Sequence, residues 1–161
     1  MDKIFQKIIA NNFSDLKGLT ADVSIPVRQQ LINEIIETAL QGNKNIDSCQ
    51  VSIGGQNRVS VNLRAILLPW PLNLKLRLDK SVDFTDSPKI WASLENNLLL
   101  GTLVSFFKGL PKGINISGNQ VIVDIGSFLR PQERKYLDLI KSAEINTEEG
   151  KVILDARVEV E

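Results

Sequence analysis

The sequence predicts an α+β protein in which a highly curved antiparallel β-sheet wraps around one long amphipathic helix, with smaller flanking helices. Apolar and polar residues alternate along two stretches between Arg58 and Ser81, as they do in strands with one buried and one solvated face. Tight turns connect most of the predicted strands, which favours antiparallel pairing. Residues 27–40 carry apolar side chains at helical spacing, so one helix can cover the sheet.

The N-terminal part of the chain predicts two helices and a short strand. Apolar residues at helical spacing predict a short amphipathic helix over residues 2–11. Residues 19–24 predict a short strand. The long helix is expected to start behind Ser24 as its N-cap, with Pro26 in its first turn and Gly42 at its end.

The middle of the chain predicts one strand followed by a long hairpin. Residues 49–53 alternate between apolar and polar side chains, and residues 54–57 have the composition of a turn. The hairpin spans residues 58–81. Its two bends are expected inside residues 68–72, because the prolines of that segment cannot donate hydrogen bonds to a ladder.

The register of this hairpin follows from its alternation. The two apolar faces lie on the same side of the sheet only if the numbers of two paired residues sum to an odd number. Leu63 opposite Leu76 or Leu78 satisfies that rule. The prediction therefore places the leucines and valines of both strands on one buried face.

The C-terminal half predicts further hairpins and short helices. Residues 96–108 form an apolar run that fits a helix or a strand, and a helix is preferred. Turn-forming residues separate the remaining elements. These are a strand over residues 89–95, a hairpin of residues 114–117 and 120–125, a short helix over residues 132–141, and a final hairpin of residues 143–147 and 151–160.

Composition limits the classes of function. The 161 residues suit a single domain, with residues 1–18 as a helical arm and residues 19–161 as the helix-and-sheet body. The balance of 19 basic and 19 acidic residues argues against nucleic-acid binding, which gains from a net basic surface. Histidine, the commonest general base and metal ligand, is missing from the sequence, and Cys49 is the only cysteine. We therefore expect no enzyme, no metal site and no cofactor.

The sequence also predicts where the protein resides. No stretch approaches the roughly 18 apolar residues of a membrane-spanning helix. The first residues lack the continuous apolar core of a signal peptide. These features predict a cytoplasmic protein, and the alternative is an export signal that has been removed from the chain.

The candidates for chemistry are weak. Asp79, Asp83 and Asp86 follow a predicted strand and lie in a loop, where solvated acids are typical. Glu148 and its neighbour lie in a predicted turn. Cys49 shares the apolar side of its strand, which is typical of a buried and unreactive thiol. None of these residues predicts a catalytic pair.

The apolar tip of the long hairpin is the sharpest candidate site. Leu67, Leu68 and Trp70 would suit insertion into a membrane interface or docking on a partner protein. The alternative is that the tip folds back under another segment. The polar face of the hairpin carries cations that fit anionic headgroups or, alternatively, only keep this face solvated. These cations are Arg64, Lys75 and Arg77.

Three segments follow one another in an informative order. They are the helix VRQQLINEIIETAL, the strand pair RVSVNLRAILLPWPLNLKLRLDKS and the closing pair GLPKGINISGNQVIVDIG. This order, over about residues 20–126, resembles the tubular lipid-binding (TULIP) superfamily and its small bacterial relatives. The resemblance implies a lipid or other apolar ligand held between helix and sheet. The implied lining residues are Leu31, Ile35, Leu63, Leu74 and Leu76. Because the chain is short for a full tube, half a tube or a homodimer is expected.

Two functions follow from these observations. The first is non-enzymatic binding of a lipid or other apolar ligand in a groove between helix and curved sheet, at a membrane surface. The alternative is a protein–protein interaction module with a fully packed core that docks through residues 67–71 or a sheet edge. A continuous apolar void of roughly 300 Å³ or more would favour the ligand, and a packed interior would favour the module.

Overall fold

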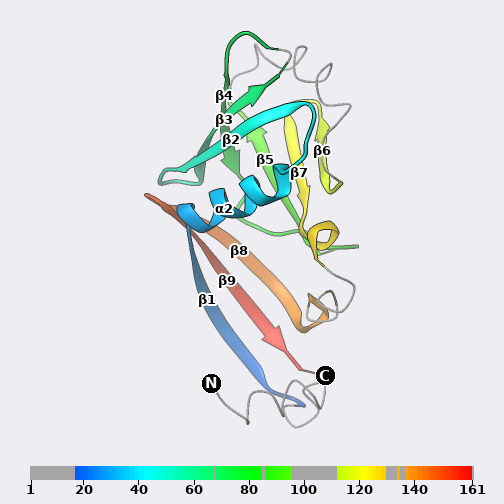
Figure 1. The fold of residues 1–161 in the computed structure, drawn as a ribbon. Coiled ribbons are helices and arrows are strands. Elements are labelled where there is room, and N and C mark those ends of the chain that lie inside the picture. Colours follow the sequence, from blue (N-terminus) through cyan, green and yellow to red (C-terminus); the bar gives the residue numbers. More distant parts are fainter. Residues whose placement is uncertain are drawn as a thin grey trace.

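The computed structural model describes residues 17–66, 68–84, 86–95, 112–129, 134 and 137–160 (Figure 1). The named helices are α2 (Gln29–Leu40) and the two short 3-10 turns η4 (Ile125–Phe128) and η5 (Leu137–Leu139), and residue 134 is also helical. The strands are β1 (Thr20–Arg28), β2 (Ile46–Ile53), β3 (Arg58–Ala65), β4 (Leu72–Leu78), β5 (Lys89–Leu94), β6 (Ile114–Ser117), β7 (Gln120–Asp124), β8 (Ile140–Glu148) and β9 (Lys151–Glu159).

The strands form a strongly curled, antiparallel arrangement. A six-stranded sheet has the order β2-β3-β4-β5-β7-β6, and a three-stranded sheet has the order β1-β9-β8. In Figure 1, α2 crosses between the two sheets, and the three-stranded sheet extends away from it as a long ribbon. The predicted α+β class and the antiparallel pairing are confirmed. The described strands divide between two sheets, whereas the prediction had one.

The start of α2 differs from the prediction. Ser24 and Pro26 lie inside β1, and the helix begins at Gln29 and runs for 12 residues. The predicted long helix is therefore wrong in its start and in its length. The reason is that β1 pairs with β9 from its first residue to its last. This ladder between distant segments outweighs the local capping signal.

The register of the β3–β4 hairpin obeys the predicted rule. Leu63 lies opposite Leu72, so the paired numbers sum to an odd number and the apolar residues share one face. The predicted partners Leu76 and Leu78 were wrong. The pairing lies closer to the tip because β4 starts directly after Pro71.

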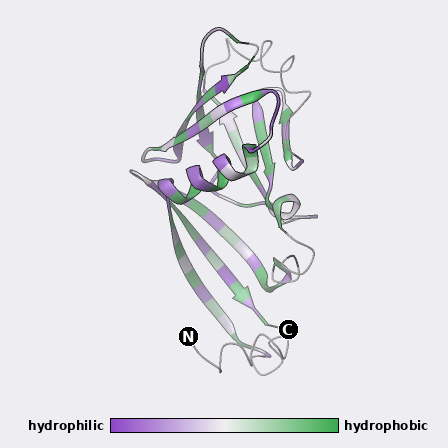
Figure 2. Cartoon of the chain, viewed as in Figure 1, coloured by the Kyte–Doolittle hydropathy of each residue, from purple (hydrophilic) through white to green (hydrophobic). Residues whose placement is uncertain are grey.

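The core of the six-stranded sheet lies under α2. Ile32 and Ile36 of the helix pack against the buried face of the sheet. Figure 2 shows hydrophobic and hydrophilic residues alternating along these strands. Burial of each large aliphatic side chain stabilises the fold by about 1.5–3 kcal/mol. The buried residues are Val51, Ile53, Val59, Leu63, Leu72, Leu74, Leu76, Ala92 and Leu94.

The three-stranded sheet has a smaller core. On β8 and β9 the apolar face is buried or half-buried, whereas residues 22–26 in the middle of β1 are exposed. Val23 and Ile25 of β1 remain 39% and 45% exposed. The buried residues of this second core are Val82, Ala143, Ile145 and Ala156.

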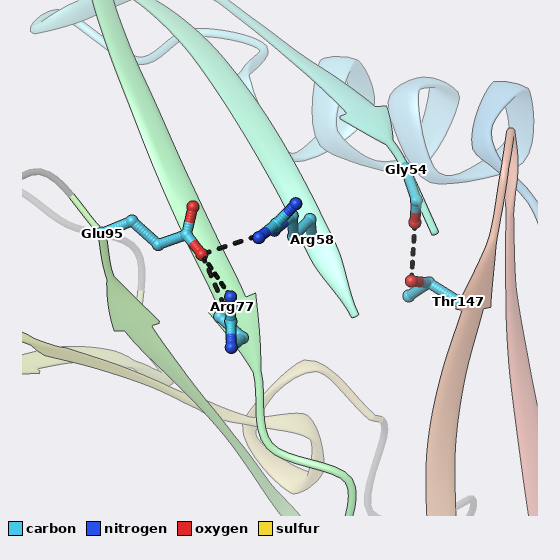
Figure 3. A network of polar contacts seen from close by, with 5 residues as sticks. All are labelled: Gly54, Arg58, Arg77, Glu95 and Thr147. Carbon is cyan, nitrogen blue, oxygen red and sulfur yellow. Dashed lines mark hydrogen bonds and ion pairs between the residues drawn. The ribbon is translucent and has the colours of Figure 1, made fainter. Parts of the chain in front are cut away.

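Asn57 joins the two sheets from the turn between β2 and β3. Its Nδ2 donates to the carbonyl of Ile145 at 3.0 Å, and its Oδ1 accepts from the backbone N–H of Thr147 at 2.9 Å. The Oγ1 of Thr147 donates in turn to the carbonyl of Gly54 at 2.6 Å (Figure 3). Asn57 has a φ of 59°, a left-handed conformation that asparagine tolerates better than most residues.

The remaining predictions have mixed outcomes. The strand over residues 89–95 and the hairpins β6–β7 and β8–β9 are confirmed. The predicted helix over residues 132–141 is wrong at its C-terminal end, where η5 is followed directly by β8. The predicted helices over residues 2–11 and 96–108 lie outside the described residues.

Candidate functional site

The hairpin tip, residues 66–71, exposes large apolar side chains. Ile66 is 59% exposed and Trp70 is 62% exposed. Leu68 behaves differently, because it is half-buried and packs against the core of the six-stranded sheet. Leu67 lies outside the described residues. The tip therefore combines the two predicted possibilities, since one apolar side chain folds back and two face the solvent.

Backbone hydrogen bonds hold the tip on the end of the sheet. The N–H of Ile66 donates to the carbonyl of Asn45 at 3.0 Å, and the N–H of Leu68 donates to the carbonyl of Ala65 at 3.1 Å. Two prolines flank Trp70 in the sequence and fix φ at their own positions. The exposed Trp70 is thus presented on a constrained turn.

Cations line the polar face of the hairpin, and they fall into two groups. At the base, Glu95 accepts a hydrogen bond from Arg77 at 3.2 Å and lies 3.6 Å from the Nε of Arg58 (Figure 3). Nearer the tip, Arg64 and Lys75 are exposed and form no ion pair with any described residue. Of the three predicted cations, Arg77 is thus paired with Glu95 within the chain, and whether any of the three contacts a headgroup or a partner stays a prediction.

The predicted ligand-lining residues do not meet in one space. Leu63, Leu74 and Leu76 are only 7–8% exposed and belong to the filled core. Leu31 and Ile35 of α2 are 50% and 59% exposed, whereas Ile32 and Ile36 are the helix residues that pack on this core. The described residues thus fill the predicted seam with protein side chains. Whether the protein binds an apolar ligand stays a prediction.

The orientation of α2 explains why these residues separate. The side chain of Asn33 accepts from the N–H of Val51 at 2.7 Å and donates to its carbonyl at 3.0 Å. Gln29 accepts from the N–H of Ile53 at 2.8 Å. These amides turn the helix so that its polar side chains satisfy the edge of β2. The sequence analysis missed this contact. The signal that could have revealed it is the spacing of Gln29 and Asn33, two amide side chains four residues apart beside the apolar stripe of the helix.

A hollow of about 500 Å³ lies between the C-terminal end of α2 and β2. Most of its lining is polar and includes the acids Glu37 and Asp47. Its apolar residues are Leu40, Ile46, Cys49 and Ile66, and the last of these places the hollow beside the hairpin tip. Burial raises the pKa of the Cys49 thiol, which keeps it protonated at neutral pH. The lining of the hollow therefore presents a thiol, and not a thiolate, at neutral pH.

A larger and more open hollow of about 740 Å³ lies on the three-stranded sheet. Its lining carries charges of both signs, and Glu144 lies directly opposite Asp155 in the register. Within the described ranges, no group of three or more His, Cys, Asp or Glu residues could hold a metal ion. The same lining also includes the apolar residues Val23, Val82 and Phe84.

Comparison with protein-family models, with characterised proteins and with solved structures found no significant similarity to this chain. The resemblance to the TULIP superfamily therefore stays a prediction. In the part of the chain that the structure describes, none of the helices is long and apolar enough to cross a membrane. The hairpin tip, with the cations behind it and the hollow beside it, is the candidate site.

Proposed function

We propose that the protein contacts anionic membrane surfaces through its hairpin tip, as a binding protein without catalysis. The supporting observation is the exposure of Trp70 and Ile66 at the end of a hairpin that carries cations and no acidic residue between residues 58 and 78. Tryptophan is favoured at the membrane–water interface, where its ring is both apolar and able to hydrogen-bond. Arginine and lysine attract anionic headgroups.

The positions of the cations along the hairpin indicate which of them can attract anionic headgroups. At the base of the hairpin, Arg58 and Arg77 share the single negative charge of Glu95. Arg64 and Lys75 lie between base and tip and form no ion pair with any described residue. Each such cation contributes about 1 kcal/mol near an anionic surface. Full burial of a large apolar side chain contributes about 1.5–3 kcal/mol. Neither term alone gives stable attachment, so binding requires both and is weakened by salt.

Vesicle flotation tests the proposal. The protein is expected to float with phosphatidylcholine vesicles that contain phosphatidylserine and to stay behind with vesicles of phosphatidylcholine alone. In a Trp91→Phe background, Trp70 is the sole tryptophan, and its emission should shift to the blue on the anionic vesicles. Equal behaviour with both vesicle types would contradict the proposal.

Substitution of Trp70 tests the apolar part of the contact. Trp70→Ala is expected to weaken vesicle binding by roughly ten-fold or more, because the largest apolar side chain of the tip is lost. Phe128→Ala is the matched control, since Phe128 is a 48% exposed aromatic residue on η4. Equal losses in the two variants would indicate non-specific adsorption.

Substitution of the cations tests the electrostatic part. The double variant Arg64→Gln/Lys75→Gln is expected to weaken binding by roughly thirty-fold, from about 1 kcal/mol per charge. The control Arg77→Gln removes a cation that is already paired with Glu95, so it should have a smaller effect. A larger effect for Arg77→Gln would place the contact at the base of the hairpin.

The four apolar residues in the lining of the hollow support a second candidate function, the binding of an apolar ligand. A single acyl chain that leaves the membrane at the tip would meet Ile66 first and then Leu40, Ile46 and Cys49. Native mass spectrometry of protein purified without detergent tests this function. Added mass that matches a lipid, and that is lost in an Ile46→Gln variant, is the expected result. A clean apo mass after incubation with lipid would argue against it.

A further inference from the structure

The sheet edges of the described residues differ in how they are protected. The amide of Asn33 covers β2 by bonding both backbone groups of Val51. The outer edge of β8 is covered because the N–H of Val82 donates to the carbonyl of Ala143 at 3.1 Å. The edge strand β6 has only four residues. Short or covered edges resist pairing with other chains.

The edge of β1 is long and open. β1 has nine residues and pairs with β9 on one side. The N–H of Gln29 donates to Gly150, and the carbonyl of Leu19 accepts from Val160, so odd-numbered positions bond to β9. The backbone groups of the even-numbered residues therefore face outward. Within the described part of the chain, none of them has a partner on that side.

We propose that β1 pairs antiparallel with β1 of a second copy of this chain, around a two-fold axis at Ile25. In this register the two Ile25 side chains lie opposite each other, and Val23 lies opposite Val27. The outward N–H of Ser24 donates to the second copy's Pro26 carbonyl. Pro26 itself lacks an N–H, so its position limits how the edge can pair. The product is one continuous sheet made of both three-stranded sheets.

Charge complementarity selects this register. It places Asp22 of each copy opposite Arg28 of the other. Neither side chain forms an ion pair with any described residue of its own chain. On β9, Arg28 faces the like charge of Lys151, and Asp22 faces Arg157. A second copy supplies the missing acid for Arg28, and the two-fold axis repeats the pair.

Exposed apolar residues on β1 support the same pairing. Val23 and Ile25 are 39% and 45% exposed on the face that is buried elsewhere in this sheet. In antiparallel sheets, directly opposed residues without mutual backbone bonds approach most closely, with Cα atoms about 4.5 Å apart. The pairing therefore covers these side chains with their own copies. This inference does not depend on membrane contact.

Solution mass tests the association. Light scattering with size-exclusion chromatography should give twice the 17.9 kDa chain mass at high protein concentration and fall toward the monomer on dilution. A monomer at every concentration would overturn the proposal.

Charge swaps identify the interface. Asp22→Arg and Arg28→Asp each place like charges opposite each other twice, so each should weaken the dimer by roughly ten-fold or more. A mixture of these two variants restores both opposite-charge pairs and should form a heterodimer. The double variant Asp22→Arg/Arg28→Asp should also recover the dimer. If neither the mixture nor the double variant forms a dimer, although each variant unfolds at a normal temperature, the proposed interface would be overturned.

Disulfide trapping fixes the register. In a Cys49→Ala background, Ile25→Cys should form a covalent dimer under mild oxidation, because opposed positions of this kind lie within disulfide range. Ser24→Cys is the neighbouring control and should crosslink more slowly. Faster crosslinking at residue 24 than at residue 25 would overturn the proposed register.

Discussion

Two isoleucines in one row of the three-stranded sheet have opposite environments. Ile25 of β1 lies opposite Leu154 of β9, which lies opposite Ile145 of β8. Ile145 is 1% exposed and Ile25 is 45% exposed. Strand alternation points both side chains to the same face. Val82 packs at the β8 side with Ile145, while nothing among the described residues covers Ile25 to the same degree. Alternation thus selects the face, and packing between distant segments decides which part of it becomes core.

Truncation of the two isoleucines should give the largest contrast. Ile145→Ala is expected to lower the free energy of unfolding by about 2–5 kcal/mol, because it leaves a cavity in a filled core. Ile25→Ala should cost less than about 1 kcal/mol in a dilute, monomeric sample, since the side chain is already solvated. Urea denaturation monitored by circular dichroism measures both. Similar losses would mean that the β1 side is covered in solution.

The hydrogen bonds of Asn57 between the two sheets offer a second test of how distant segments stabilise the fold. Asn57→Ala should lower the free energy of unfolding by about 2–4 kcal/mol, because it leaves the carbonyl of Ile145 and the N–H of Thr147 without their partner and retains a left-handed backbone. Asn57→Gly relieves the backbone and should recover part of the loss. Asn62→Ala is the control, since its amide bonds only an exposed Asn73. Equal losses of unfolding free energy at residues 57 and 62 would mean that Asn57 does not stabilise the contact between the two sheets.

Local pattern predicted most strands, because alternation and turn composition are properties of neighbouring residues. The hairpins β3–β4, β6–β7 and β8–β9 follow from such signals. Contacts between distant residues were not predictable in this way. Residues 54–57 were predicted as a turn, yet the bonding partners of Asn57 lie 88 and 90 residues away. The same limit applies to β1, where pairing with β9 replaced the first turn of the predicted helix.

The candidate site shows the same division. The sequence placed Trp70 at an apolar tip, and Trp70 is exposed there. It did not indicate that Arg77 pairs with Glu95, which lies just after the next strand, 18 residues away. Leu31 and Ile35 were expected to line a seam, but the bonds of Asn33 to β2 turn them to the solvent. The ion pair of Arg77 and the hydrogen bonds of Asn33 could be found only in the structure, whereas the apolar tip could be predicted from the sequence.

Removal of Asn33 should make the covered edge of β2 resemble the open edge of β1. Asn33→Ala leaves the N–H and carbonyl of Val51 without their partner and is expected to cost about 1–2 kcal/mol of unfolding free energy. Gln30→Ala is the matched control, because Gln30 is exposed and bonds only Glu34 on the same helix. Asn33→Ala gains more helix propensity than Gln30→Ala, so propensity cannot explain a larger loss of stability at residue 33, and such a loss reports on the edge contact. Analytical ultracentrifugation of the two variants should also show added self-association only for Asn33→Ala, because an uncovered edge is free to pair. Equal stability and equal mass in the two variants would mean that packing of Ile32 and Ile36, and not the amide, keeps the β2 edge closed.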